Sequence, residues 1–259
     1  MSMADATMSP ELPLVRRLEA VGFRAWPADA VAYDGSWLIR LTANHDSRRL
    51  NSVNPLDPSD SRDIVARLEK AASRFSEGGR ALTVRQTPLT PPALIGYMDE
   101  NGWARIAETR VMLADIQSLE SSDGVEHLPT RDIGRFVDAR LDVTGEDASK
   151  KAGLADIIAA IKPETGLFVF ETADTGPTAV SLVVHDNDLA GLLQLAVAPS
   201  ERRKGVATAI VQASLRWARL RGARQAWLAV EADNHAAIAL YRKFGFRDVY
   251  RYLYRRAGE

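Results

Sequence analysis

Cysteine is absent from the 259 residues of this chain. Disulfide bonds, thiolate metal ligands and a cysteine nucleophile are therefore excluded, and a reducing compartment is compatible with the composition. Long apolar runs are also missing, since none approaches the ~20 residues that a membrane-spanning helix requires. The first residues lack the basic and then apolar pattern of a secretory signal. We expect a cytoplasmic globular protein with no metal site and no membrane partner.

The net charge is nearly balanced at −1, but the charges are unevenly distributed. Residues 201–259 carry 13 Lys and Arg against 5 Asp and Glu, a net charge of +8, which leaves −9 for the rest of the chain. A basic segment is typical of proteins that bind nucleic acid, but it equally suits a small polyphosphate ligand. We favour the small ligand and expect no nucleic-acid partner, because the charge accompanies a glycine turn and no nucleic-acid-binding motif is present.

Two common phosphate-binding motifs are absent as well. No Gly-Lys-Ser/Thr follows a glycine-rich loop, and the three spaced glycines of dinucleotide-binding domains are missing. Instead, a basic link at residues 197–207 joins a predicted strand at 189–197 to a helix predicted from Val206 to about Arg221. The first turn of a helix has N–H groups without intrahelical partners and carries partial positive charge. Gly205 has no Cβ to keep a ligand off the backbone, so the link predicts a seat for a phosphate or pyrophosphate.

The basic link and a later segment both resemble known signatures. The spacing Arg202-x-x-Gly205-x-Ala207 resembles the acetyl-CoA-binding signature Arg/Gln-x-x-Gly-x-Gly/Ala of the GNAT acetyltransferase superfamily. A second block reads Asn-x-x-Ala-x-x-Leu-Tyr from Asn234 to Tyr241 and is followed by Gly-Phe, which is similar to the family's second signature. Both signatures occur in the expected order, and the resemblance is close from roughly residue 166 to residue 254.

The order of predicted elements agrees with that resemblance. Strands at 166–172, 178–185 and 189–197 predict an antiparallel meander, and the crossover helix that follows favours parallel pairing of 189–197 with a strand at 226–230. A last strand is expected at 249–254. The crossover helix has one apolar stripe that should pack on the sheet, made of Val206, Ile210, Ala213, Trp217 and Leu220. We therefore expect a mixed α/β (α+β) GNAT-like fold, with a mostly antiparallel central sheet flanked by helices.

The N-terminal half repeats this order of elements. Gly102 and Gly245 end similar helical segments 143 residues apart, and Val84 and Val230 lie in similar strands 146 residues apart. A repeat of that length suggests two duplicated domains, each with its own sheet. The polar stretch 48–55 stands where the first copy would have its phosphate turn, and it has no glycine. We expect a disordered tail at 1–10, a degenerate GNAT-like domain at 11–117, a linker at 118–126 and a catalytic domain at 127–259.

The resemblance also implies roles for individual residues. Acetyl-CoA is expected between the two parallel strands, with its pantetheine arm along the first strand and its pyrophosphate on the turn. Tyr241 would protonate the leaving thiolate, and Glu231 is the best-placed candidate for the general base. The expected coenzyme contacts are Leu195, Ala196, Val197, Arg202, Arg203, Lys204, Gly205, Val206, Ala207, Thr208 and Asn234.

Each assignment has a purely structural alternative. The basic residues could be surface charge at a helix start, although cations at that end oppose the macrodipole. Tyr241 lies on an apolar stripe and could be only a core aromatic, while Asn234 could only cap its helix. In the N-terminal half, Arg40 and Arg49 are polar landmarks. The polar run 48–55 could line a substrate cleft between the domains, but we favour turn formation by its Asn and Ser residues.

The leading hypothesis is an N-acetyltransferase that moves an acetyl group from acetyl-CoA to a primary amine by direct attack. The alternative is a non-catalytic acyl-CoA-binding or sensor protein, because a phosphate seat suits both. The sequence does not identify the acceptor amine. A monomer and a homodimer are both compatible with it, since a sister domain can replace a second subunit.

Overall fold

The structure, a computed structural model, describes residues 11–118, 127–174 and 176–258. The expected tail at 1–10 and residues 119–126 of the expected linker lie outside the described residues. The helices are α1 (Leu12–Ala25), α2 (Ile64–Glu77), α3 (Pro92–Glu100), α4 (Ile133–Thr144), α5 (Lys151–Ala160), α6 (Val206–Leu220) and α7 (His235–Lys243). The strands are β1 (Ala30–Asp34), β2 (Trp37–Leu41), β3 (Ser52–Pro55), β4 (Thr83–Gln86), β5 (Ala104–Asp115), β6 (Glu164–Thr172), β7 (Gly176–Asp186), β8 (Leu189–Val197), β9 (Gln225–Glu231) and β10 (Arg247–Arg256). No helix within the described ranges is long and apolar enough to cross a membrane.

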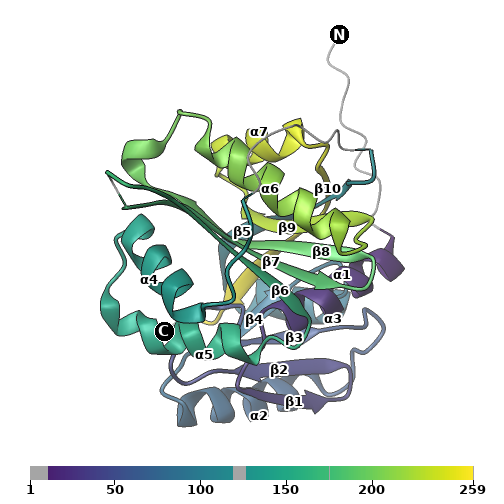
Figure 1. Cartoon of the computed structure of the whole chain (residues 1–259). Coiled ribbons are helices and arrows are strands. Elements are labelled where there is room, and N and C mark those ends of the chain that lie inside the picture. Colours follow the sequence, from purple (N-terminus) through teal and green to yellow (C-terminus); the bar gives the residue numbers. More distant parts are fainter. Residues whose placement is uncertain (1–10, 119–126, 175, 259) are drawn as a thin grey trace.

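The ten strands of the described residues form one sheet, in the order β1-β2-β3-β4-β10-β5-β9-β8-β7-β6 (Figure 1). Two neighbouring pairs are parallel, β3 with β4 and β8 with β9. The other neighbours are antiparallel. The mixed, mostly antiparallel α/β architecture is therefore confirmed. The expectation of a separate sheet in each domain was wrong, because both halves contribute to one continuous sheet.

The two halves are joined because their last strands exchange places. β10 of the C-terminal half lies between β4 and β5 of the N-terminal half, and β5 lies between β10 and β9. Tyr254 of β10 pairs with Arg85 on one side and with Ile106 on the other. Neither half completes its part of the sheet with its own residues alone. The sequence could not show this exchange. The alternation of apolar and polar residues along a strand shows which residues share a face, but it does not show which strands lie beside it.

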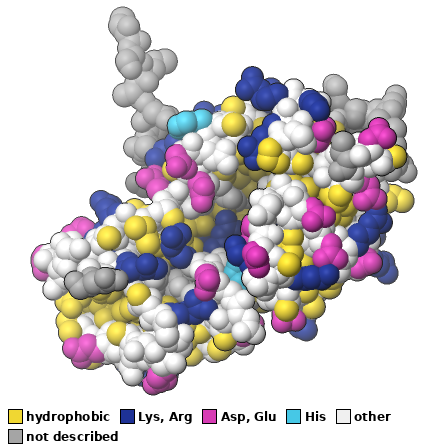
Figure 2. All heavy atoms as spheres, turned by 90° about the vertical axis from the view of Figure 1, so that its left-hand side faces the viewer, with side chains coloured by type: hydrophobic (Ala, Val, Ile, Leu, Met, Phe, Trp, Pro, Cys, Tyr) yellow, Lys and Arg dark blue, Asp and Glu magenta, His cyan; other side chains and the backbone are white. Residues whose placement is uncertain are grey.

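Helices cover both faces of the sheet. α6 and α7 lie on one face, where they form an apolar core with Leu192 and Leu228 (Figure 1). α1, α4 and α5 pack on the other face, around Leu193 and Trp227. A third core surrounds Trp37 in the N-terminal half. Seen from the side, the surface is hollowed between two lobes, and Lys and Arg side chains lie on the walls of the hollow (Figure 2).

Helix α6 begins at Val206 as expected, but its buried face differs from the expected stripe. Ile210 and Trp217 are buried, whereas Leu220 is 72% exposed. Ser214 is completely buried instead, and its Oγ donates a hydrogen bond of 3.1 Å to Oγ of Ser181 on β7. A serine that satisfies its hydroxyl across a helix–sheet contact is not detected by a count of apolar spacings.

A close approach at Gly191 allows Trp227 to lie against β8. A Cβ added at Gly191 would be 2.6 Å from Cζ2 of Trp227, which is shorter than any real contact. A Cβ added at Gly22 of α1 would be 3.7 Å from Cη2 of the same ring, an ordinary distance. The indole therefore contacts both the strand and the helix, and it does so beside the last registered pair of β8 and β9, Leu192 with Leu228.

We expect Gly191→Ala to lower the free energy of unfolding by about 1 to 3 kcal/mol, because the indole must shift within a packed core. Gly22→Ala is the matched control, since it adds the same methyl group toward the same ring without a clash. In a helix interior this change should leave stability unchanged or raise it by about 1 kcal/mol. Urea unfolding of the two variants measures the difference, and equal stabilities would contradict the close approach.

Candidate functional site

The candidate site begins where the parallel strands β8 and β9 part. Their registered pairing ends at Leu192 with Leu228. Beyond this point β8 continues to Val197 beside β7 alone, and β9 continues to Glu231 beside β5. No strand of the described chain fills the gap. The backbone groups of β8 that face the gap are therefore available to another partner.

A bulge in β8 coincides with this parting. The register against β7 shifts so that Gln194 and Leu195 both stand opposite Ser181. Gln194 has a φ of 52°, and its side-chain oxygen accepts a hydrogen bond of 3.1 Å from Nε of Arg140 on α4. No sequence signal indicated the bulge, because glutamine seldom adopts this left-handed backbone region.

The turn after β8 is open to solvent. Arg203 and Gly205 have φ values of 65° and 86°, and Gly205 is the N-cap of α6. Glycine offers no capping side chain, so the first N–H groups of the helix are uncapped. Apart from Gly205 and its two chain neighbours, no described residue has an atom within 4 Å of a Cβ added at Gly205. The turn therefore presents unpaired amides to open space.

Three basic residues precede these amides in the turn. Arg202, Arg203 and Lys204 are exposed, and Nζ of Lys204 lies 3.1 Å from a carboxylate oxygen of Glu201. Thr208 is also exposed in the first turn of α6. The segment therefore combines cationic side chains, a hydroxyl and uncapped amides, which together suit an anionic ligand.

Tyr241 of α7 lies in the core on the same face as this turn. It is 7% exposed, and its ring meets that of Phe246 edge-on at 5.8 Å between centroids. Leu195 and Val197 of the parted strand pack against the same core. Burial raises the pKa of the Tyr241 phenol to about 12, so the hydroxyl keeps its proton at neutral pH. Tyr241 is thus a core aromatic, as its position on the apolar face of the helix indicated. Its protonated hydroxyl is also a potential proton donor.

Asn234 and Glu231 stand at the other side of the gap. Asn234 caps α7, since its Oδ1 accepts a hydrogen bond of 3.1 Å from the backbone N of Ala237. The cap does not use the Nδ2 group, which remains a donor. Glu231 is the last residue of β9, is exposed, and pairs through its backbone with Thr109 of β5. The N-cap interpretation of Asn234 is confirmed.

The N-terminal half has a parallel pair of its own, but its turn differs in charge. Residues 56–63 connect β3 to α2, and they contain no glycine and three acidic residues, Asp57, Asp60 and Asp63. Hydrogen bonds from Ser36 lower the pKa of Asp60 to about 2, so this carboxylate is charged at neutral pH. Negative charge at that helix start opposes the binding of a phosphate.

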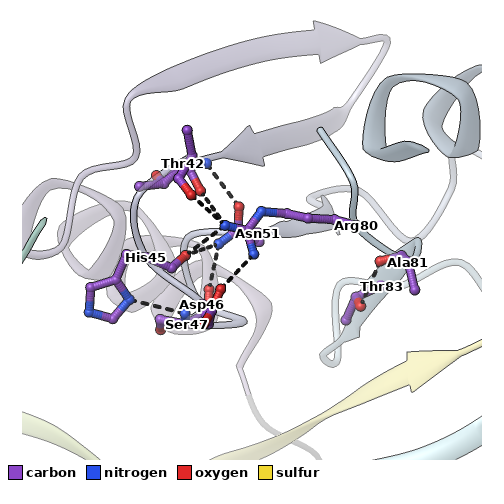
Figure 3. Close-up of polar contacts among 9 residues, drawn as sticks. Thr42, His45, Asp46, Ser47, Asn51, Arg80, Ala81 and Thr83 are labelled. Carbon is purple, nitrogen blue, oxygen red and sulfur yellow. Dashed lines mark hydrogen bonds and ion pairs between the residues drawn. The ribbon is translucent and has the colours of Figure 1, made fainter. Parts of the chain in front are cut away.

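The polar stretch 48–55 was wrongly expected to be the counterpart of the phosphate turn. Residues 52–55 are β3 itself, and the preceding residues belong to the loop after β2. Asn51 fixes this loop through hydrogen bonds of 2.7 to 3.1 Å with the backbone of Thr42, His45 and Ser47 (Figure 3). Arg80 donates to carbonyl oxygens of the same loop. The favoured interpretation of Asn51 as a turn-forming residue is confirmed.

Known proteins resemble this chain over nearly its whole length. YobR of Bacillus subtilis, described as an uncharacterized N-acetyltransferase, is 25% identical over 253 residues, which is 93% of this chain and 98% of that protein. A GCN5-related N-acetyltransferase from Kribbella flavida has a TM-score of 0.67 at 16% identity and covers 94% of this chain and 96% of its own. A tandem GNAT protein from the clavulanic acid biosynthesis pathway has a TM-score of 0.63 at 16% identity, with coverage of 93% and 88%.

The relative from Bacillus subtilis is described as an N-acetyltransferase, which favours an enzyme over the acyl-CoA-binding alternative. At these identities the two structures show the shared fold alone. A family model described as probable histone acetyltransferase Rv0428c C-terminal matches residues 14–255 and so spans both halves of the sheet. The chain therefore belongs to this family and is an acyltransferase of the GNAT superfamily.

Proposed function

We propose that this acyltransferase moves an acetyl group from acetyl-CoA to a primary amine by direct attack, and that the C-terminal half of the chain performs the reaction. The proposal depends mainly on one observation. Strands β8 and β9 separate after Leu192 and Leu228, and the basic turn beside this gap is exposed and has glycine as the helix N-cap. An extended pantetheine arm can replace the missing strand through backbone hydrogen bonds. An uncapped helix N-terminus can hold the diphosphate.

The residues on both sides of the gap fit the two ends of the coenzyme. The pantetheine arm would lie along Leu195, Ala196 and Val197, which have lost their neighbour on the β9 side. The diphosphate would accept hydrogen bonds from the amides of Gly205, Val206, Ala207 and Thr208. Arg202, Arg203 and Lys204 would supply compensating charge, and Nδ2 of Asn234 would donate to the arm from the opposite side of the gap.

The chemical step needs one base and one acid. Glu231, directly or through water, would take the proton from the acceptor ammonium, because only the neutral amine is nucleophilic. The amine nitrogen then forms a bond to the thioester carbonyl carbon, and the carbon–sulfur bond breaks. A strand amide near Val197 would stabilise the negative charge on the carbonyl oxygen. The hydroxyl of Tyr241 would give its proton to the leaving sulfur. The Tyr241 phenolate would then regain a proton from the amide nitrogen, and Glu231 would release its proton to water, so charges and protons balance.

The acidic turn of the N-terminal half supports assignment of the reaction to the C-terminal half. Its carboxylates occupy the place that the basic turn has in the other half, and they disfavour a diphosphate. We therefore infer that residues 11–117 are a degenerate sister domain, joined through 118–126 to a catalytic domain at 127–259. In this arrangement the N-terminal half supplies β5 and part of the surroundings of the site instead of a second coenzyme seat.

We expect Gly205→Glu to abolish acetyl-CoA binding in isothermal titration calorimetry, because its carboxylate would lie over the amides that hold the diphosphate. Gly222→Glu is the matched control. It adds the same charge in open surroundings, and its φ of 100° imposes a comparable backbone strain at the other end of α6. This control should bind acetyl-CoA like the wild type. If both variants bind alike, the amides ahead of Val206 are not the diphosphate seat.

We expect Tyr241→Phe to lower kcat by about 100-fold with little change in acetyl-CoA affinity, because the phenol acts only as the leaving group departs. Release of the free thiol measures turnover. Since the pKa of Tyr241 is about 12, its deprotonation should not lower the wild-type rate until the pH approaches that value. Tyr97→Phe on α3 is the control, and its kcat should be unchanged. If Tyr241→Phe has the same kcat as the wild type, Tyr241 has a packing role alone.

We expect Glu231→Gln to lower kcat/KM by about 100-fold at neutral pH, because the amide cannot accept the proton. Glu69→Gln, an exposed glutamate on α2, removes the same charge away from the gap and should behave like the wild type. If Glu231→Gln has the same kcat/KM as the wild type, proton removal is assigned to water without this carboxylate.

A further inference from the structure

A cavity of about 40 Å³ lies between the two halves of the sheet. Its charged lining comes from the N-terminal half, with Glu19 of α1, Arg40 of β2, Arg49 of the loop before β3 and Arg85 of β4. The C-terminal half contributes Leu193 and Ala229, among others. The sequence pointed to Arg40 and Arg49 as polar landmarks, but it gave no reason to bring Glu19 and Arg85 to the same place.

Positive charge exceeds negative charge in this cavity by two, since three guanidinium groups face one carboxylate. Glu19 is already engaged, because it accepts hydrogen bonds from Arg85 and from the hydroxyl of Tyr250. Arg40 donates to two backbone carbonyls, those of Arg49 and Trp26. Arg49 lies beside the phenol of Tyr252, which also lines the cavity. Among the described residues, Arg40 and Arg49 form no ion pair with a carboxylate.

The surplus positive charge shifts the pKa values of neighbouring groups. Burial and the nearby Arg85 lower the pKa of Arg40 to about 10. Burial acts to raise the pKa of Tyr252, but Arg49 and Arg85 outweigh it and hold that pKa below its ordinary value. Nε of Arg85 is buried without a hydrogen-bond partner in the described part of the chain. Buried charge without a counter-charge is costly, and an anionic ligand would remove the cost.

The cavity lies beside the gap between β8 and β9. Leu193 and Ala229 are the first residues after the last registered pair of these strands. Both belong to the core that packs against α1, α4 and α5, whereas Tyr241 belongs to the core under α6 and α7. A ligand in the cavity and a coenzyme beside α6 would therefore approach the gap from opposite faces of the sheet.

We propose that this cavity binds the carboxylate of the acceptor, and that the acceptor is a free α-amino acid. Guanidinium groups bind carboxylates through paired, charge-assisted hydrogen bonds. In an α-amino acid the amine is one carbon away from the carboxylate, so anchoring the carboxylate in the cavity brings the amine to the gap. The inference rests on the proposed function, because it names the acceptor for that same reaction.

A groove of about 520 Å³ continues from the cavity and offers room for the amino-acid side chain. The two share Glu19, Phe23 and Arg40. Much of the remaining lining of the groove is apolar and includes Leu38 and Leu89. A branched or aromatic apolar side chain therefore fits better than a positively charged one, because Arg16, Arg24 and Lys162 also line the groove. A lysine-rich peptide or a polyamine would bring positive charge to an already cationic cavity.

Three compounds that differ by single groups test the acceptor class with the full-length protein. They are leucine, 3-methylbutylamine, which is leucine without its carboxylate, and 4-methylpentanoate, which is leucine without its amine. We expect kcat/KM for thiol release from acetyl-CoA to be at least ~100-fold higher with leucine than with 3-methylbutylamine. Equal values for the two amines, or faster transfer to a lysine-rich peptide, would overturn the proposal.

Calorimetry with 4-methylpentanoate adds a readout that needs neither turnover nor acetyl-CoA. Arg49→Gln should weaken this binding by about 10-fold or more, because a charged hydrogen bond is lost. Arg48→Gln removes the same charge from the exposed neighbouring residue and should bind like the wild type. If the wild type does not bind 4-methylpentanoate, or if both variants bind it alike, the cavity is not a carboxylate site. Acetyl-CoA binding by the same samples decides separately on the proposed function.

Discussion

The parting of β8 and β9 is the constraint on which the site depends. A strand edge must find hydrogen-bond partners, and the described residues supply no strand on this edge beyond Leu192. The gap cannot close by simple movement, because β8 is paired with β7 on its other side and β9 is paired with β5 along its whole length. Since β5 belongs to the N-terminal half, that half fixes one wall of the gap. The exchange of last strands is therefore part of the site and not only of the fold.

The two halves have similar elements, but the N-terminus of the helix that follows the first parallel strand differs between them. This helix is α2 in the N-terminal half and α6 in the C-terminal half. In the N-terminal half the acidic turn is satisfied within the protein, because Arg67 lies 3.2 Å from both Asp34 and Asp60. Ser36 adds hydrogen bonds to Asp60. In the C-terminal half the turn around Gly205 is exposed and uncapped. The helix start is thus closed by internal contacts in one half and open to an anion in the other, which is why we propose a coenzyme seat in the C-terminal half alone.

Local signals in the sequence predicted local structure well. The end of β8 at Val197 and the start of α6 at Val206 follow from an apolar run, a proline and a glycine turn. The features that the sequence did not predict depend on contacts between residues that are distant along the chain. The pairing of β10 with β4, and the meeting of Glu19 with Arg85, join segments with no shared pattern. For the same reason Arg49 could be recognised as unusual in its loop, but the cavity that it lines could not be derived.

Strand β10 connects the two sides of the site. Tyr250 and Tyr252 on β10 line the cationic cavity, where the hydroxyl of Tyr250 donates to Glu19 and the guanidinium of Arg85 lies 3.7 Å from the ring centroid of Tyr252. The same strand begins directly after the end of α7, the helix that carries Tyr241. Because β10 is hydrogen-bonded on both edges, by β4 and by β5, its position is strongly determined. The spacing between Tyr241 and the cavity is therefore set by one strand, and the contacts of Tyr250 and Tyr252 with Glu19 and Arg85 also hold that strand in place.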